Sequence, residues 1–137
     1  MSEFATSNQE LPRVLVFDQD RDATEVVRDR LEKEGMAVTR VHSFIEALPH
    51  LSPTRVDLIL ISLPEDDWTK NALLTQLRRA NPAGAIVAMV ADASTDLSRL
   101  LDSFNVARVP PAAGESWRDA LDGIRQALEL HDEPHAR

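Results

Sequence analysis

The chain has 137 residues, enough for one domain with one hydrophobic core. Its 23 acidic residues outnumber its 15 basic ones, and the net charge of −8 argues against a protein that binds a nucleic-acid backbone, because such a protein needs a basic surface. The sequence contains no cysteine, which excludes disulfides, thiol catalysis and thiolate metal sites.

The composition along the chain predicts a flexible tail at residues 1–10, a folded domain at 11–130 and a second flexible tail at 131–137. The first ten residues contain no apolar or basic block, and the longest apolar runs elsewhere have the length of a β-strand. We therefore expect a cytoplasmic protein with neither a signal peptide nor a membrane-spanning helix.

The first three elements of the domain alternate as strand, helix and strand. Val14–Phe17 is a continuous apolar run of strand length. Asp22–Glu34 predicts a helix that Gly35 ends, and Ala37–Val41 predicts a short second strand. The stripe at helical spacing on the first helix consists of Ala23, Val26, Val27, Arg30 and Leu31.

A short helix comes next. Ser43 and Glu46 have the spacing of a capping box, in which two side chains satisfy free backbone N–H groups at a helix start. Pro49 lies within this helix and should bend or shorten it, because proline removes a backbone donor. Val56–Ile61 then predicts a buried strand, and Ser62 follows it directly.

The second half of the domain continues the alternation. Two further apolar runs predict strands, and three stripes at helical spacing predict helices. Trp117 falls on the stripe of the last helix, so we expect it in the core. In chain order these elements are a helix through Leu73–Leu77 that ends near Asn81, a strand at 85–90, a helix at 97–104, a strand at 106–109 and a helix at 117–128.

Five strands alternating with five helices predict an α/β fold with a parallel sheet covered on both faces. The second and fifth strands contain Thr39, Arg40 and Arg108, so we expect them at the edges of the sheet. Right-handed crossovers then favour the flavodoxin-like doubly wound sandwich, (βα)5, with strand order 2-1-3-4-5. Ligands of such sheets bind where strands one and three end, which in this chain is at Asp18, Gln19, Asp20 and Ser62.

Four segments, in order along the chain, resemble the receiver domain of two-component response regulators over roughly Leu11–Leu130. They are Val14–Asp20, Ser43–Leu48, Val56–Ile61 and Val109–Pro111. The resemblance implies a signalling domain in which a carboxylate takes phosphate from a phosphohistidine with Mg²⁺ held by acidic residues. It also implies a cis peptide bond before the proline of the turn after the fifth strand, here the Pro110–Pro111 bond.

The residues at the positions that carry this chemistry depart from the family pattern. Ser62 stands at the acceptor position, and a hydroxyl is a poor nucleophile without a neighbouring base. We expect its hydroxyl to bond nearby backbone instead. The departures predict a pseudo-receiver with no catalytic residue, no cofactor and no metal. Besides Ser62, the departures from the family pattern are Gln19 for the second acid of the cluster, Val90 for a Ser or Thr, Ala107 for an aromatic residue and Pro110 for a lysine.

The remaining polar residues have plainer interpretations beside a functional one. Asp18 and Asp20 could bind a weak divalent ion, but capping of the first helix is favoured. Asp66 and Asp67 could be displaced acceptors, but solvated loop charges are favoured. Trp68 is either a binding hot spot or a cover over the vacant site. The histidines share no spacing and read as surface residues.

Three function hypotheses follow. The first, which we adopt because it needs no chemistry that the sequence lacks, is a phosphorylation-independent receiver that acts as a protein–protein interaction module. The second is a phosphorylatable receiver with a non-standard acceptor. The third is a small-molecule-sensing domain with its ligand above Asp18 and Ser62.

The resemblance implies a docking surface on the helix at 97–104, the strand at 106–109 and the last helix, the face that receivers use for dimers and outputs. Mixed charges at its outward positions suit a two-fold contact between copies. We expect signalling proteins or a second copy as partners, and neither nucleic acid nor membrane. The outward residues are Arg99, Asp102, Arg108, Arg118, Asp122 and Arg125.

Overall fold

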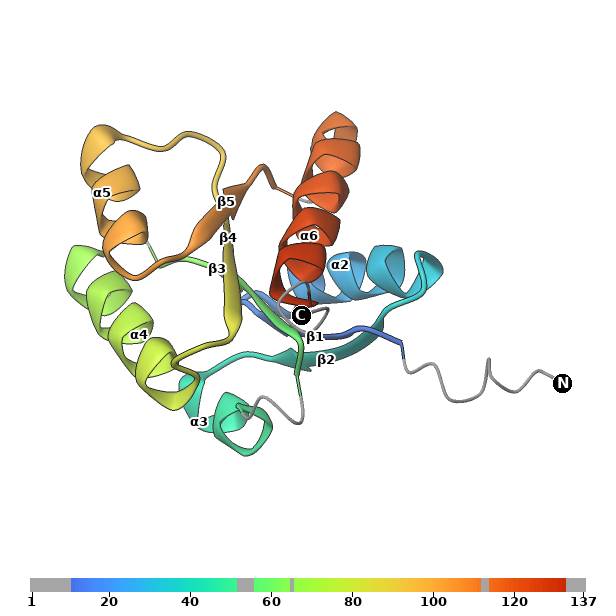
Figure 1. Cartoon of the computed structure of the whole chain (residues 1–137), viewed down its shortest axis with the longest axis horizontal. Coiled ribbons are helices and arrows are strands. Elements are labelled where there is room, and N and C mark those ends of the chain that lie inside the picture. The colour runs from blue at the N-terminus through green and yellow to red at the C-terminus, as the bar shows by residue number, and fades with distance from the viewer. Residues whose placement is uncertain (1–10, 52–55, 65, 112–113, 133–137) are drawn as a thin grey trace, which may run out of the picture.

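The computed structural model describes residues 11–51, 56–64, 66–111 and 114–132. A five-stranded parallel sheet forms its centre, in the order β2-β1-β3-β4-β5 (Figure 1). This is the predicted flavodoxin-like order, with the predicted strands at both edges. The strands are β1 (Arg13–Phe17), β2 (Ala37–Val41), β3 (Leu58–Ser62), β4 (Ala85–Met89) and β5 (Ala107–Val109).

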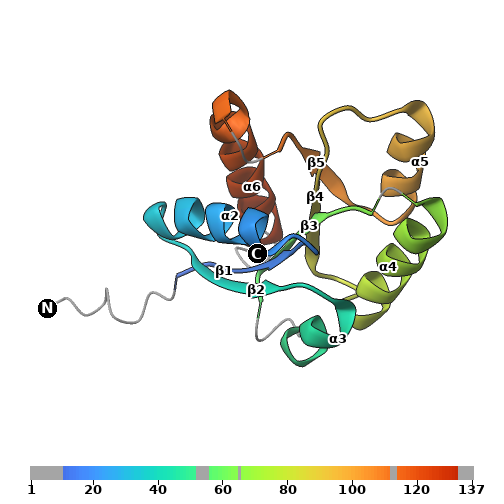
Figure 2. The same cartoon turned by 180° about the vertical axis from the view of Figure 1, so that it is seen from behind.

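Helices cover both faces of the sheet, as Figures 1 and 2 show from opposite sides. One face packs against α2 and α6, and the other packs against α3, α4 and α5. The helices are α2 (Arg21–Lys33), α3 (Phe44–Ala47), α4 (Asp67–Ala80), α5 (Thr95–Ser103) and α6 (Trp117–Asp132), with short 3₁₀ helices η1 (Leu48–His50) and η2 (Gly114–Ser116).

The core is divided by the alternation of side chains along each strand. In β1, Leu15 and Phe17 pack with the α3–α5 layer, whereas Val14 and Val16 pack with α2 and α6. In β3, each residue from Leu58 to Ile61 is at most 1% exposed. Inner strands must be apolar on both faces, which is why they read as continuous apolar runs.

Some element boundaries match the predicted ones and others differ. Pro49 shortens its helix as predicted, because α3 ends at Ala47 and η1 follows. The strand predicted from Val56 begins only at Leu58, and α6 continues to Asp132, two residues beyond the predicted end of the domain. The predicted tail at residues 1–10 lies outside the described residues, as does the predicted tail at 131–137 apart from residues 131 and 132, which belong to α6.

An ion pair fixes the register of the two central strands at their amino ends. The Asp57 carboxylate accepts from the Arg13 backbone N–H at 2.8 Å and from its guanidinium at 3.1 and 3.2 Å. The Asp57 N–H donates to the Arg13 carbonyl at 2.8 Å. Phe17 therefore lies opposite Ile61, and the residues after both strands emerge side by side at the carboxyl end.

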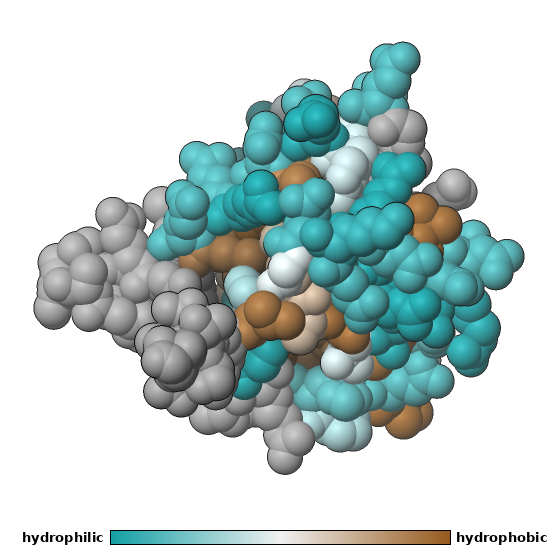
Figure 3. Space-filling model, turned by 90° about the vertical axis from the view of Figure 1, so that its right-hand side faces the viewer, coloured by the Kyte–Doolittle hydropathy of each residue, from teal (hydrophilic) through white to brown (hydrophobic). Residues whose placement is uncertain are grey.

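The surface carries little continuous apolar area on the side drawn in Figure 3, where small brown areas are separated by hydrophilic side chains. Within the described part of the chain, no helix is both long and apolar enough to cross a membrane.

Candidate functional site

A hollow of about 300 Å³ opens where β1, β3 and β4 end, at the place predicted for a ligand. Asp18 and Ser62 are its polar lining residues, and both are half-buried. The other described lining residues are Ala23, Val26, Val27, Met89 and Pro111.

The two acidic residues after β1 form a helix start, as the favoured interpretation has it. The Asp20 carboxylate caps α2 by accepting from the N–H groups of Asp22 at 2.9 Å and Ala23 at 3.2 Å. Asp18 Oδ1 in turn accepts from the Asp20 N–H at 2.9 Å. Asp20 is exposed and does not line the hollow, so only one of the two carboxylates reaches it.

Gln19 faces a different part of the molecule. It lines a second hollow of about 220 Å³ between the start of α3 and the first turns of α4, together with Phe44 and Leu73. The residue that replaces the second acid of the family pattern is therefore not beside Ser62.

Ser62 ends β3 and lies opposite Met89 of β4 in the strand register. The expected bond from its hydroxyl to nearby backbone is not present: among the described residues, nothing hydrogen-bonds that hydroxyl. The described residues contain no group of three or more His, Asp or Glu side chains that could hold a metal ion. No histidine or lysine lines the described part of the hollow, so no such side chain activates the hydroxyl as a nucleophile.

Val90 and Pro110 follow β4 and β5 at the same end of the sheet, but neither lines the hollow. The Val90 N–H donates to the Val109 carbonyl at 2.8 Å, and the Val90 side chain packs with the α3–α5 layer. Met89 and Pro111, their chain neighbours, line the hollow instead. The sequence did not reveal this. Side chains alternate between the two faces of a sheet, so a shift of one residue along a strand reverses which side chain faces the site.

The predicted cis bond at Pro110–Pro111 is wrong, since the described residues contain no cis peptide bond. The trans form is favoured by about 0.5–1 kcal/mol before proline unless the surroundings impose the other. With Pro110 in place of the lysine, the turn has no cationic side chain to present to the site, so this requirement for the cis form is gone.

Val26 and Val27 were also missed as lining residues. Adjacent residues on a helix point about a quarter-turn apart, so both cannot face the core. Val27 is 6% exposed, whereas Val26 is 46% exposed at the mouth of the hollow. The adjacency of two valines on one predicted stripe was the available signal.

Three further predictions about single residues need correction. Asp66 and Asp67 are exposed, as predicted, but they begin a helix: Asp66 caps α4 by accepting from the Thr69 N–H at 2.8 Å, and Asp67 is the first helical residue. His42 is not a surface residue, because its side chain is 12% exposed and its Nε2 lies 3.1 Å from the Thr24 hydroxyl. Trp117 is half-buried at the edge of the core, where the Arg30 guanidinium lies 5.4 Å from its ring centroid.

Trp68 does not cover the site. It is 81% exposed, more than any other large apolar side chain that the structure describes, and it lies in the first turn of α4. Of its two predicted alternatives, folding over the vacant hollow is excluded, and the binding role is untested.

All six predicted docking residues are exposed on α5, β5 and α6. Arg108 Nη1 donates to the Ser98 hydroxyl at 2.8 Å, within the predicted face. Arg125 pairs with Glu34 beyond the end of α2 at 2.7 Å, so its guanidinium is directed toward α2. The remaining four are Arg99, Asp102, Arg118 and Asp122.

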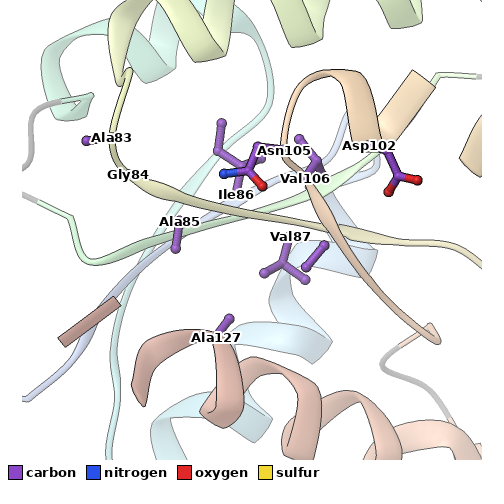
Figure 4. A pocket seen from close by; sticks show the side chains of 10 residues that line it. Ala83, Gly84, Ala85, Ile86, Val87, Asp102, Asn105, Val106 and Ala127 are labelled. Carbon is purple, nitrogen blue, oxygen red and sulfur yellow. The ribbon is translucent and has the colours of Figure 1, made fainter. Parts of the chain in front are cut away.

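A hollow of about 390 Å³ opens at the amino end of β5, between α5 and α6 (Figure 4). β5 pairs only with Val87–Met89, so Ala85 and Ile86 at the start of β4 have no partner on β5. Figure 4 shows Asp102 and Asn105 on the α5 side of this hollow and Ala127 on α6. The predicted docking face is therefore hollowed at this end.

No family model and no curated protein matches the sequence. Solved receiver domains match the structure. The receiver domain (CheY-like) of a response regulator from Methanospirillum hungatei has a TM-score of 0.75 and 21% identity, covering 90% of this chain and 98% of that one. The chemotaxis protein CheY4 of Vibrio cholerae has a TM-score of 0.72 and 15% identity, covering 85% and 98%.

A third match is the signal receiver domain of an HD domain-containing protein from Pseudomonas fluorescens, with a TM-score of 0.75, 18% identity and coverage of 94% and 95%. At these identities the likeness concerns the backbone and not the site residues. The chain has the fold of CheY-like receiver domains, with a hollow at the place where those sheets bind their ligands.

Proposed function

We infer that this chain is a receiver domain that works without phosphorylation, as a protein docking module in signal transduction. The observation that carries the proposal is the composition of the hollow at Ser62. A hydroxyl stands where the chemistry requires a carboxylate, and apolar side chains form the remaining wall apart from Asp18.

The charge of the hollow also opposes phosphoryl transfer. Asp18 is the one charged residue among its described lining residues, and it is negative. A phosphoryl donor brings several negative charges, which need a metal ion or a cation for neutralisation. Asp18 alone repels such a donor and supplies too few oxygen ligands for Mg²⁺.

The alternative acceptors are engaged elsewhere. Both the Thr69 hydroxyl and its N–H donate to the Asp66 carboxylate, and these bonds, the hydroxyl bond first, hold the pKa of that carboxyl below its usual value. Asp67 projects into solvent on α4, 3.5 Å from the Lys70 ammonium. Neither residue lines the hollow that contains Ser62.

A docking role is supported by the face formed by α5, β5 and α6. Charges of both signs are exposed on it, and the hollow beside Asp102 and Ala127 offers space for a side chain of a partner. Mixed charge with an adjoining cavity suits a specific contact better than a solvated surface of one sign.

Titration with beryllofluoride and Mg²⁺, followed by amide NMR, tests the proposal. Beryllofluoride mimics a phosphoryl group bound to a carboxylate. We expect no saturable shift at the amides of Asp18, Ser62 and Val90. Saturable, Mg²⁺-dependent shifts at these amides would show that the site still assembles a phosphoryl complex, and would contradict the proposal.

A further inference from the structure

The hollow at the end of β1 and β3 has the composition of a small-molecule site. Such sites are mostly apolar, contain a few polar groups that fix orientation, and in doubly wound sheets lie where the strand order reverses. The hollow meets all three conditions, and its volume of about 300 Å³ lies at the small end of the usual range.

We propose that this hollow binds a small organic cation, a protonated primary amine on a compact apolar body. The inference goes beyond the docking function and does not depend on it, because the two use different surfaces.

Asp18 determines the charge of the ligand. Its carboxylate is half-buried, and Oδ1 already accepts from the Asp20 N–H at 2.9 Å. No cationic side chain lines the described part of the hollow, so a cationic ligand would complement the negative charge of Asp18 without competition from the protein. A charge-assisted hydrogen bond in a partly desolvated site is stronger than a neutral one.

Ser62 determines how the cation is held. An ammonium group has three N–H donors, and the Ser62 hydroxyl can accept one of them. The described residues leave this hydroxyl without a hydrogen-bond partner, as shown above. Asp18 and Ser62 line the same hollow, and a primary amine satisfies both, whereas a carboxylate or phosphate satisfies only the hydroxyl and meets the charge of Asp18.

The apolar wall determines the body of the ligand. Val26 is 46% exposed, although α2 buries Val27 beside it, and a ligand in the hollow would cover Val26. Met89 also lines the hollow, and a flexible thioether side chain adapts to irregular shapes. A compact ring or branched alkyl group fits this wall better than a polar or extended chain.

The test is a titration of the full chain with cyclohexylamine, followed through the methyl NMR signals of valine and methionine. Cyclohexylamine is a protonated amine at pH 7, and cyclohexanecarboxylate has the same body with the opposite charge. We expect saturable shifts at Val26, Val27 and Met89 with the amine. The carboxylate should bind about tenfold more weakly than the amine, or more weakly still.

A matched pair of variants distinguishes binding in the hollow from nonspecific attraction of the amine to the negatively charged chain. Asp18→Asn keeps the oxygen that accepts from the Asp20 N–H and removes the charge, and should weaken amine binding about tenfold. Asp22→Asn makes the same change of charge at an exposed position on α2 outside the hollow, and should leave binding unchanged.

Any of three results would overturn the inference: no saturable shift with the amine, equal affinity for the amine and the carboxylate, or equal effects of the two variants. NMR shifts spread over acidic residues outside the hollow would also overturn it, because they would indicate nonspecific binding. Phosphorylation of the chain would contradict the proposed function but not the inference of amine binding. Failure of amine binding would contradict this inference but not the docking function.

Discussion

At the scale of single residues, Ser62 decides which chemistry the site can perform. Its position at the end of β3, opposite Met89, is the one from which a side chain enters the hollow. Asp18 shares the hollow, but Gln19, Val90 and Pro110 do not line it. Restoring one carboxylate at Ser62 therefore does not restore the groups that would hold a metal ion or a phosphoryl group.

We expect Ser62→Asp to remain unphosphorylated by acetyl phosphate and Mg²⁺ and to be less stable than the native chain by about 1–2 kcal/mol. The new carboxylate would be half-buried beside Asp18, with no cation to compensate. Urea unfolding at neutral pH measures the loss. Ser62→Asn has nearly the same shape without the charge and should lose less. Robust Mg²⁺-dependent phosphorylation of Ser62→Asp would show that the other departures do not matter.

A second prediction concerns the start of α3. The Ser43 hydroxyl caps α3 as predicted, by accepting from the Glu46 N–H. The Glu46 carboxylate does not return a bond to the N–H of the cap residue but accepts from the N–H of His42, one residue earlier, at 2.7 Å. This hydrogen bond, followed by the charges of His42 and Arg21, holds the pKa of Glu46 below its usual value of 4.5. A lowered pKa in the folded state favours folding above the unfolded-state pKa, and the benefit is lost as the pH falls through the folded-state pKa.

The native chain should therefore lose stability between about pH 5 and pH 3 more steeply than Glu46→Gln, which has no carboxyl at this position to titrate. Urea unfolding at several pH values, with the His42 amide signal as a local probe, measures the difference. Identical pH slopes for the two proteins would mean that the Glu46 carboxylate does not stabilise the turn.

At the scale of elements, alternation and edge polarity were sufficient to predict the architecture. Thr39, Arg40 and Arg108 marked the edge strands because a polar residue is tolerated where one side of a strand faces solvent. Contacts between segments distant in the sequence were not predictable. Neither the Arg13–Asp57 pair nor the bond between His42 and Thr24 has a local pattern, since each depends on which strands and helices become neighbours.

Arg78 is the clearest contact of this kind. Its guanidinium donates to five backbone carbonyls, at Asn81, Pro82 and Gly84 after α4 and at Phe104 and Asn105 after α5. Asn81 and Phe104 are the C-caps of the two helices, whose free carbonyls carry partial negative charge. The side chain thus joins two turns at the end of the sheet opposite Ser62.

Arg78→Met should lower the free energy of unfolding by about 2–4 kcal/mol, because several charge-assisted hydrogen bonds are lost together. Arg78→Lys should recover less than half of that loss, because one ammonium cannot span both turns. Arg79→Met, at the next and exposed position, is the matched control and should change stability by about 0.5 kcal/mol or less. Equal losses at the two positions in urea unfolding would show that the carbonyl contacts contribute nothing.

At the scale of the whole molecule, the fold and the position of its hollow followed from the sequence, whereas the lining of the hollow did not. Side-chain direction at Met89 and Val90 depends on strand register, and the geometry at Pro110 depends on what the turn must present. Our proposals assign a function to two surfaces: the hollow at Ser62 and the face formed by α5, β5 and α6.

If that face pairs two copies, the chain should self-associate, and added salt should weaken the association because exposed charges contribute to it. Arg118→Glu should raise the dissociation constant about five- to tenfold. Arg79→Glu, on α4 and outside the face formed by α5, β5 and α6, is the control for the change of charge and should have no effect. Sedimentation velocity over a range of concentrations measures both. A monomer under all conditions would exclude pairing between copies and leave a different protein as the partner.

We propose that this chain keeps the fold of a receiver domain without its phosphorylation chemistry. Intact-mass spectrometry tests it most directly, after the full chain has been incubated with Mg²⁺ and either acetyl phosphate or a phosphorylated histidine kinase. We expect an unchanged mass under both conditions, because Ser62 presents a hydroxyl where the phosphorylation chemistry requires a carboxylate. An added phosphoryl group on any residue, acid-labile or acid-stable, would contradict the account.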